Sequence, residues 1–294
     1  MPVIFKNPRL SDYFLKLPGL RADTPPEAIP SIVAPYEHGR AIYFRDLKFD
    51  IDHDFWAWLP TEGYNKLKKL PSSPSAHDPA DDPMLDRRLQ EAQVPPEMER
   101  RLKREILRFY EQVLPVYEAM FRPYHFVRRQ VVWRLNTIHN ENLHIDTYQT
   151  DFKEHFARLF INLDTQPRIW MTGYNMDELF ARFGDRIPQE VMANGTPSQV
   201  RKALNTAAFG GRSNMWWDRQ PRHMVYFDPG DVWAIDSRQV AHQIFYGRRA
   251  VSIDFFVDPK SMVKPKRYYL TMADTLRRRH LESRKPPPVA EAAE

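Results

Sequence analysis

Two segments of this chain decide its expected fold and chemistry: NENLHIDTYQ (residues 140–149) and QVAHQIFYGRRAVSIDFF (residues 239–256). The first contains His144 and Asp146 in a His-x-Asp triplet, and the second contains His242. Two imidazoles and one carboxylate can hold a metal from one side and leave its other positions open, as in non-haem Fe(II) oxygenases. The pattern therefore predicts an iron site with room for a cosubstrate and O2.

Two arginines, Arg248 and Arg249, follow the second histidine within the same segment. A guanidinium pairs with a carboxylate through a planar fork, which the ammonium of lysine does not match. An arginine after the distal histidine therefore suits the far carboxylate of 2-oxoglutarate. Since neighbouring residues of a strand face opposite sides, we expect only one of the two to point inward.

A His-x-acid triplet is a weak signal by itself. With 10 His and 38 acidic residues among 294, chance gives roughly one such triplet. The chain has three, His139-x-Glu141, His144-x-Asp146 and His280-x-Glu282. The third lies in the basic stretch LRRRHLES with no later histidine, and the first falls in a polar run that is typical of a loop. The middle triplet is the favoured metal ligand set because strand-like segments flank it.

Short β-branched or aromatic segments dominate the chain from residue 126 onward. They are bounded by Gly, Pro, Asp and Asn, which is typical of strands. The segments are FVRRQVVWRL, FARLFINLD, RIWMTGY, HMVYFD, DVWAID, HQIFYG and AVSIDFFVD. We therefore expect a mainly β fold. The long stretch of sequence between the two ligand segments favours a double-stranded β-helix (jelly-roll, cupin-like) barrel with helices packed on its outside.

The expected organisation has three parts. Residues 1–125 form an N-terminal α/β extension packed on the barrel, and they include an amphipathic helix over 95–121 that Pro115 should kink or split. Residues 126–262 form the catalytic core, with an insert at about 174–221 that contains two short helices. Residues 263–294 form a basic C-terminal helix followed by a disordered tail.

Composition excludes several kinds of site. There is no cysteine, so disulfides, Fe–S clusters and cysteine-bound zinc are ruled out. The sequence contains no G-x-G-x-x-G or Walker pattern. The start MPVIFKNPRLSDYF has no signal-peptide pattern and no segment resembles a membrane span, so we expect a cytoplasmic protein.

The formal net charge of +5 and the pI of about 9.3 make a polyanionic partner plausible. Arg277, Arg278 and Arg279 concentrate positive charge near the C-terminus. This segment fits either a membrane-surface contact or a helix docked on the barrel with a solvated basic face. Nucleic acid is not expected, because no dense basic helix or RNP-like aromatic stretch is present.

The NENLHIDTY…FARLFINLD and AHQIFYGRRAVSIDFF blocks resemble the Kdo hydroxylase family of lipopolysaccharide biosynthesis, and the resemblance covers most of the chain. It implies an Fe(II)/2-oxoglutarate dioxygenase that hydroxylates carbon 3 of a 3-deoxy-D-manno-octulosonic acid (Kdo) residue in Kdo-lipid A. His144, Asp146 and His242 would then ligate iron. Arg249, with Arg248 as the alternative, would bind 2-oxoglutarate.

An anionic glycolipid substrate implies cationic and aromatic residues near the site, and a peripheral location on the cytoplasmic face of the inner membrane. The candidates for substrate contacts are Arg128, Arg129, Arg134, Lys153, Arg158, Trp170, Arg212 and Trp216. Three alternatives stay open from the sequence: the same iron chemistry on a protein, nucleotide or small molecule, a non-enzymatic cupin-like binding protein, and a zinc hydrolase with the same ligands.

Overall fold

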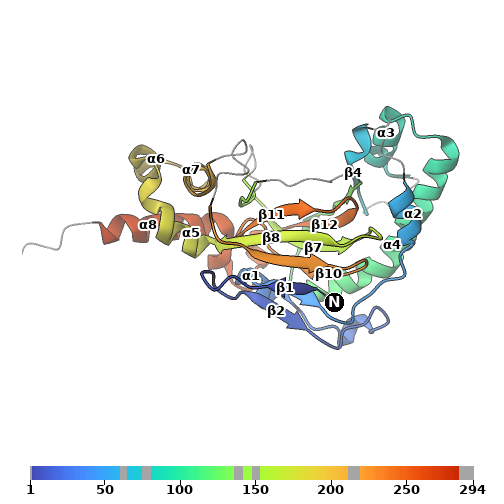
Figure 1. The fold of residues 1–294 in the computed structure, drawn as a ribbon, viewed down its shortest axis with the longest axis horizontal. Helices are drawn as coiled ribbons and strands as arrows, with labels where there is room; N and C mark the ends of the chain where they lie inside the picture. Colours follow the sequence, from blue (N-terminus) through green and yellow to red (C-terminus); the bar gives the residue numbers. More distant parts are fainter. Residues whose placement is uncertain are drawn as a thin grey trace, which may run out of the picture.

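Two β-sheets packed face to face form the centre of the protein (Figure 1). The structure is a computed structural model that describes residues 2–59, 65–74, 81–135, 142–147, 153–210 and 219–284. The four-stranded sheet has the order β1 (Val3–Phe5), β9 (His223–Phe227), β8 (Arg168–Asn175), β11 (Val240–Tyr246). Its neighbouring strands all pair antiparallel.

The second sheet has eight strands. Its order is β2 (Phe14–Leu17), β3 (Ala41–Phe44), β10 (Val232–Ala234), β7 (His155–Asn162), β12 (Ala250–Val257), β6 (Val131–Arg134), β4 (Lys69–Ser72), with β5 (Phe126–Arg128) paired to β12. All pairs are antiparallel except β2 with β3. The expected mainly β fold is confirmed. Among the described strands no hydrogen-bonded pair joins the two sheets, so a closed barrel is not seen.

Aromatic side chains fill the space between the two sheets. Phe160 and Trp233 come from the eight-stranded sheet, and Trp170, Phe227 and Ile244 come from the four-stranded sheet. Phe227 stacks on Trp233 with ring centroids 3.8 Å apart, and Phe160 meets Trp170 edge-on at 4.9 Å. We call the face of the eight-stranded sheet that carries Phe160 and Trp233 its inner face. The opposite side is its outer face.

The outer face packs against the long helix α4 (Pro96–Met120). Pro95 precedes this helix and Pro96 is its first residue. Proline is suited to this position because the N–H groups of the first turn have no partner within the helix. The helix runs through Pro115 without a break, although the sequence predicted a kink or split there. The neighbouring Val113, Val116 and Tyr117 are buried, and their packing offsets the hydrogen bond that proline cannot donate.

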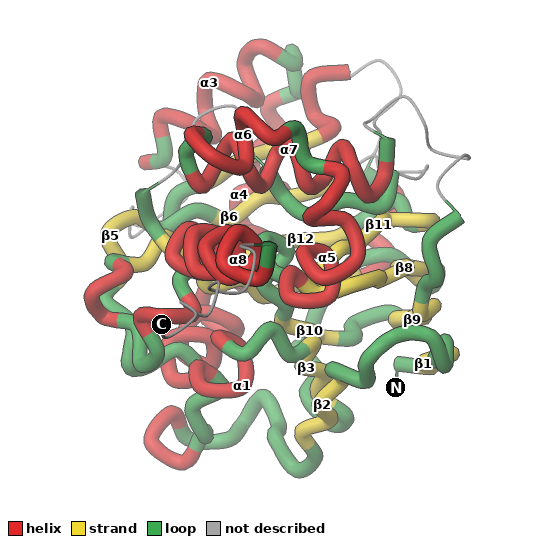
Figure 2. Tube along the Cα trace, turned by 90° about the vertical axis from the view of Figure 1, so that its left-hand side faces the viewer, coloured by secondary structure: helices red, strands yellow, loops and turns green. Residues whose placement is uncertain are grey.

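A cluster of helices covers one end of the sheets, at the left of Figure 1 and toward the viewer in Figure 2. It comprises α5 (Met176–Phe183), α6 (Gln189–Asn194), α7 (Pro197–Phe209) and α8 (Tyr269–Ser283). Capping boxes at Asn175 and Thr196 start α5 and α7, and Gly210 ends α7 with a positive φ of 72°. The first three helices lie within residues 174–221, where the sequence predicted an insert with two short helices. The last is docked on them, so its apolar side is already covered within the chain.

The remaining described elements are short helices, most of them in the N-terminal third. The short α-helices are α1 (Val33–Glu37), α2 (His53–Trp58) and α3 (Pro83–Glu91), and the 3-10 helices are η1 (Pro26–Ala28), η2 (Asn65–Lys68), η4 (Gly184–Arg186), η5 (Pro259–Ser261) and η6 (Pro265–Arg267). Residues before 126 do more than pack on the core, because they add β1 to one sheet and β2, β3 and β4 to the other. No helix in the described part of the chain is long and apolar enough to cross a membrane.

One stacked pair of tryptophans joins α2 to the outer face. Trp133 on β6 lies parallel to Trp56, with ring centroids 4.7 Å apart and planes 3° apart. Its indole N–H donates to the Ser72 hydroxyl at 2.8 Å. We expect W133A to lower the free energy of unfolding by about 3–5 kcal/mol in urea titrations, because it leaves a large buried cavity. The control W58A removes a side chain that is 61% exposed and should change stability by no more than about 0.5 kcal/mol. Equal losses in both variants would contradict this packing.

Candidate metal centre

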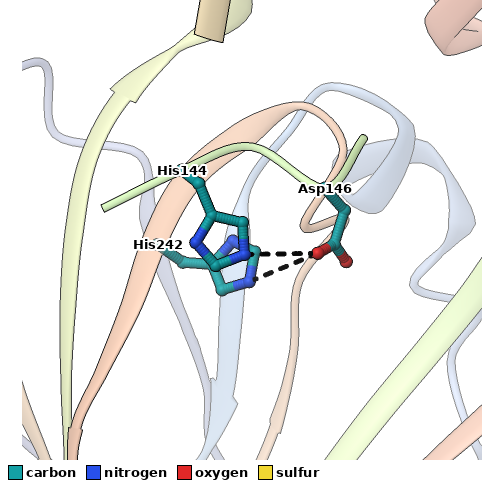
Figure 3. A group of neighbouring side chains, drawn as sticks. All are labelled: His144, Asp146 and His242. Carbon is teal, nitrogen blue, oxygen red and sulfur yellow. Dashed lines mark ion pairs between the residues drawn. The ribbon is translucent and has the colours of Figure 1, made fainter. Parts of the chain in front are cut away.

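Three side chains that could ligate a metal converge at one end of the space between the sheets (Figure 3). His144 and His242 lie opposite each other in an isolated antiparallel β-bridge, with backbone N–H···O distances of 3.1 and 2.8 Å. Asp146 lies two residues beyond His144, and its own N–H donates to the Ser237 carbonyl at 2.9 Å. One carboxylate oxygen, Oδ1, is 3.5 Å from Nε2 of His144 and 3.9 Å from Nε2 of His242. One potential ligand atom from each residue thus faces a common point.

Backbone carbonyls set the orientation of both imidazoles. Nδ1 of His144 is 2.6 Å from the Asn142 carbonyl oxygen, and Nδ1 of His242 is 3.3 Å from the Val240 carbonyl oxygen. A carbonyl can only accept, so each Nδ1 carries a proton, and Nε2 is the ring nitrogen on the side of Asp146 that could bind a metal once deprotonated. Such outer hydrogen bonds are typical of histidines that bind metals.

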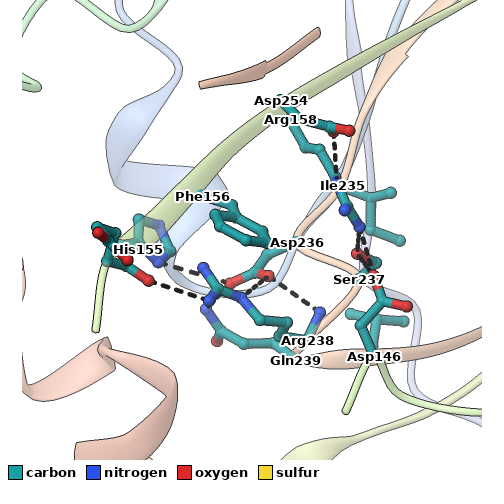
Figure 4. Close-up of polar contacts among 12 residues, drawn as sticks. Asp146, His155, Phe156, Arg158, Ile235, Asp236, Ser237, Arg238, Gln239 and Asp254 are labelled. Atoms are coloured by element: carbon teal, nitrogen blue, oxygen red, sulfur yellow. Dashed lines mark hydrogen bonds and ion pairs between the residues drawn. The ribbon is translucent and has the colours of Figure 1, made fainter. Parts of the chain in front are cut away.

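The second carboxylate oxygen of Asp146 is already bonded. The Arg158 guanidinium and the Ser237 hydroxyl both donate to Oδ2, the latter at 2.7 Å. Arg158 also donates to Asp254 at 2.7 Å (Figure 4). Burial by itself would raise the pKa of Asp146, but Arg158 and the two histidines hold that pKa well below its usual value. The carboxylate is therefore ionised, with Oδ1 turned to the imidazoles.

Helix α7 fixes the backbone of the His-x-Asp loop. Asn205 accepts a hydrogen bond from the Ile145 N–H at 2.9 Å, and Arg201 donates to the Asp146 carbonyl at 2.8 Å. Arg201 is 2% exposed and also donates to the Arg238 carbonyl. Sequence reasoning missed these residues. Their i, i+4 spacing on a predicted helix was the available signal, but it does not say which loop the helix faces.

The turn that carries Ser237 is braced from behind (Figure 4). Asp236 accepts hydrogen bonds from the Arg238 N–H at 3.0 Å and from the Gln239 side chain at 2.8 Å. Arg238 donates to the Glu154 carbonyl, and its guanidinium lies 3.8 Å from the centre of the Phe156 ring. These contacts position the carbonyl and the hydroxyl of Ser237, which both bond to Asp146.

The two arginines expected at the cosubstrate are engaged elsewhere. Arg248 forms a forked pair with Asp164 at 3.0 and 2.7 Å. Arg249 donates to the carbonyls of Trp56 and Leu59, near the end of α2, at 2.9 and 2.8 Å. The sequence predicted that one of them points inward from the last strand, whereas both precede β12 and neither reaches the metal ligands in the structure. The cause is the register of the strand. Residues two apart face the same side, and Arg249 lies two residues before Val251, which packs on the outer face.

The other expected contacts fall into three groups. Arg158 and Trp170 lie beside the metal ligands, and Trp170 is 2% exposed with its ring stacked on His242 at 5.5 Å. Arg134 lies on β6, whereas Arg128, Arg129 and Lys153 lie at the surface, with Arg128 over the Phe256 ring and Arg129 paired with Glu118. Arg212 and Trp216 lie outside the described residues, as does the end of the predicted disordered tail.

Two imidazole nitrogens and one carboxylate oxygen around a common point, mounted between two antiparallel sheets, define the class of mononuclear metalloproteins to which non-haem Fe(II) oxygenases belong. A family model described as 3-deoxy-D-manno-oct-2-ulosonic acid (Kdo) hydroxylase matches residues 21–280. The chain belongs to this family. A search of curated proteins found no match.

Solved structures of the Kdo hydroxylase KdoO, a non-heme Fe(II) alphaketoglutarate-dependent dioxygenase, share the fold. The apo structure matches with a TM-score of 0.66 and 15% sequence identity, covering 93% of this chain and 98% of that one. The complex with succinate and Fe(III) matches with a TM-score of 0.67 and 14% identity, covering 90% and 95%. The complex with alphaketoglutarate and Fe(III) gives 0.65 and 14%, covering 89% and 95%.

Removing one imidazole should abolish metal retention. We expect H242A to weaken Fe(II) binding by at least about 100-fold in anaerobic titrations, since loss of an outer hydrogen bond alone costs 10–100-fold at comparable sites. The control H280A removes the histidine of a different His-x-acid triplet, on α8, and should bind Fe(II) like the wild type. Tight Fe(II) binding by H242A would argue against this ligand set.

A buried histidine near the site should make stability depend on pH. His155 is fully buried, and burial lowers its pKa to about 4 from a usual 6.5. Between these values the unfolded chain binds a proton that the folded chain does not, so the free energy of unfolding falls as pH drops from 6.5 to 4. We expect H155Q to have a shallower pH dependence in that window, by on the order of 3 kcal/mol in total. Parallel stability curves for H155Q and the wild type would refute this assignment.

Proposed function

We propose that this chain is an Fe(II)/2-oxoglutarate-dependent dioxygenase that hydroxylates carbon 3 of a Kdo sugar in Kdo-lipid A. The observation that carries the proposal is the convergence of His144, Asp146 and His242 in a member of the Kdo hydroxylase family. The similar solved structures were obtained with iron and with alphaketoglutarate or succinate, which supports the same cofactor and cosubstrate here.

The donor set fits Fe(II). Two neutral imidazole nitrogens and one ionised carboxylate suit this metal, and a single bound oxygen of Asp146 leaves open positions for cosubstrate. Bound Fe(II), 2-oxoglutarate and O2 would supply the oxidation that converts a substrate C–H into C–OH, with release of succinate and CO2.

The residues around the candidate ligands would hold the centre in one geometry and cover part of it. Arg158 and Ser237 occupy Oδ2 of Asp146, so this carboxylate is directed to the metal through Oδ1. Trp170 covers one face of the His242 ring, and Phe160 packs behind Trp170. Excluding water favours attack on a positioned substrate bond over side reactions.

We infer that the catalytic core, residues 126–262, is a double-stranded β-helix. Beginning with β6, the chain passes back and forth between the two sheets, except that β8 and β9 follow each other within one sheet. β6, β7, β10 and β12 belong to one sheet, whereas β8, β9, β11 and the bridged His144 segment belong to the other. Repeated crossing between two facing antiparallel sheets is typical of a jelly roll. Helices α5 to α7 would be the insert, residues 1–125 the extension and 263–294 the tail.

The anionic substrate would approach basic groups at the surface. Arg128 and Lys153 are exposed, and Arg278 on α8 has a side chain that is 65% exposed. We propose that such groups contact the sugar carboxylates or anionic lipid headgroups of the inner membrane. Arg212 and Trp216 remain proposed substrate contacts from the sequence alone.

The direct test follows two products of one incubation. Protein loaded with Fe(II) is incubated with 2-oxoglutarate, O2 and Kdo-lipid A, while succinate and lipid mass are measured. We expect succinate and a lipid that gains one oxygen atom, and we expect H144A to yield neither. Succinate without lipid oxidation would direct the search to another substrate. No succinate from protein shown to hold Fe(II) would overturn the dioxygenase assignment.

A further inference from the structure

The inner face of the eight-stranded sheet carries two arginines at different depths. Phe160 on β7 lies on this face, and its partner across the ladder is Ser252 on β12. Since side chains alternate and paired residues share a side, Asp254 and Ala250 also lie on the inner face. Asp254 pairs with Arg158 on β7, and Ala250 pairs with Arg134 on β6. Arg158 and Arg134 therefore both lie on the inner face. Their partners on β12 are four residues apart.

The neighbours of Arg134 confirm its direction. Val131 and Trp133 on β6 pack on the outer face with α4, and exposure alternates along the strand. Arg134 must therefore point to the inner side, where Lys69 of β4 lies next to it across the ladder.

The guanidinium of Arg134 has no side-chain hydrogen bond or ion pair to the rest of the described chain. Its Nε is buried and lacks a partner within those ranges. By comparison, Arg249 is bonded to two helix carbonyls on the outer face, and Arg248 is paired with Asp164. A buried guanidinium nitrogen without a partner is costly, so the site favours a ligand that accepts from it.

Arg158 has a different task, because it already bonds both Asp146 and Asp254. Arg158 lies beside the metal ligands, at the level of Asp254 on β12. Arg134 lies at the level of Ala250, which is about 13 Å further along β12. Between these two levels the inner face of β12 carries the small side chain of Ser252, and Ala250 lies beside Arg134 itself. A five-carbon dicarboxylate chelated at the metal would have room to extend over these small side chains, and the long side chain of Arg134 would reach back toward it.

We propose that Arg134, and neither Arg248 nor Arg249, binds the distal carboxylate of 2-oxoglutarate. The proposal rests on the proposed dioxygenase function and deepens it. The fork of the guanidinium pairs with that carboxylate, which gives Nε its missing acceptor and selects a 2-oxoacid with a second charge at its far end.

The experiment compares two 2-oxoacids that differ only at the far end. Anaerobic Fe(II) protein is titrated with 2-oxoglutarate and with 2-oxopentanoate, and binding is followed by the visible charge-transfer absorption of a 2-oxoacid chelated to Fe(II). The ratio of the two Kd values isolates the distal carboxylate. We expect R134Q to weaken 2-oxoglutarate binding by roughly 100-fold and to leave 2-oxopentanoate binding unchanged, so that the ratio approaches one.

The control R249Q should keep the wild-type ratio, and R134K should give an intermediate ratio because it retains charge without the fork. The lysine variant also serves if R134Q does not fold. A wild-type ratio in R134K and R134Q, a ratio that collapses in R249Q instead, or equal weakening of both ligands in R134Q overturns the assignment. Absence of 2-oxoglutarate binding to wild-type Fe(II) protein would instead refute the dioxygenase function itself.

Discussion

The geometry of the metal centre depends on two backbone hydrogen bonds between His144 and His242. They pair a short loop segment with the start of β11 and bring together residues that lie far apart in the sequence. A non-local contact of this kind closes a long loop, and its entropic cost must be met by packing elsewhere. Leu143 and Ile145 supply that packing, since both are fully buried against the helices at the end of the sheets. The histidines and their apolar neighbours therefore form one structural unit.

Buried charge is the second feature of this region. Arg158, Arg201 and Arg238 are each 6% exposed or less, within contact of Asp146 or of the groups that hold it. Buried ions are costly unless they are paired and hydrogen-bonded, and such networks are weak sources of stability. Here the arrangement is better understood as a means of fixing one conformation. It determines which oxygen of Asp146 is bonded by protein and which faces the imidazoles.

The sequence predicted the triad, the mainly β core, the long helix and the helical insert because each has a local signal. Residue type and spacing identify His144, Asp146 and His242, and periodicity identifies 95–121. The directions of Arg248 and Arg249 could not be predicted, because they depend on where β12 begins, and a shift of one residue reverses every side chain. The helix was predicted to kink or split at Pro115, and the split does not occur because local propensity yields to packing on both sides. The N-terminal strands β1, β3 and β4 were not predicted as parts of the two sheets because they are short. Only their pairing with β9, β10 and β6 shows where they belong.

The docking of α8 ties the end of the chain to the metal ligands. Tyr269 lies between two guanidinium groups, 4.4 Å from that of Arg201 and 3.9 Å from that of Arg238. Arg201 in turn holds the carbonyl of Asp146. Both arginines therefore connect α8 with the segment that carries Asp146. A variant that loosens α8 would thus act on Asp146 through two cation–π contacts, without touching any of the three candidate ligands.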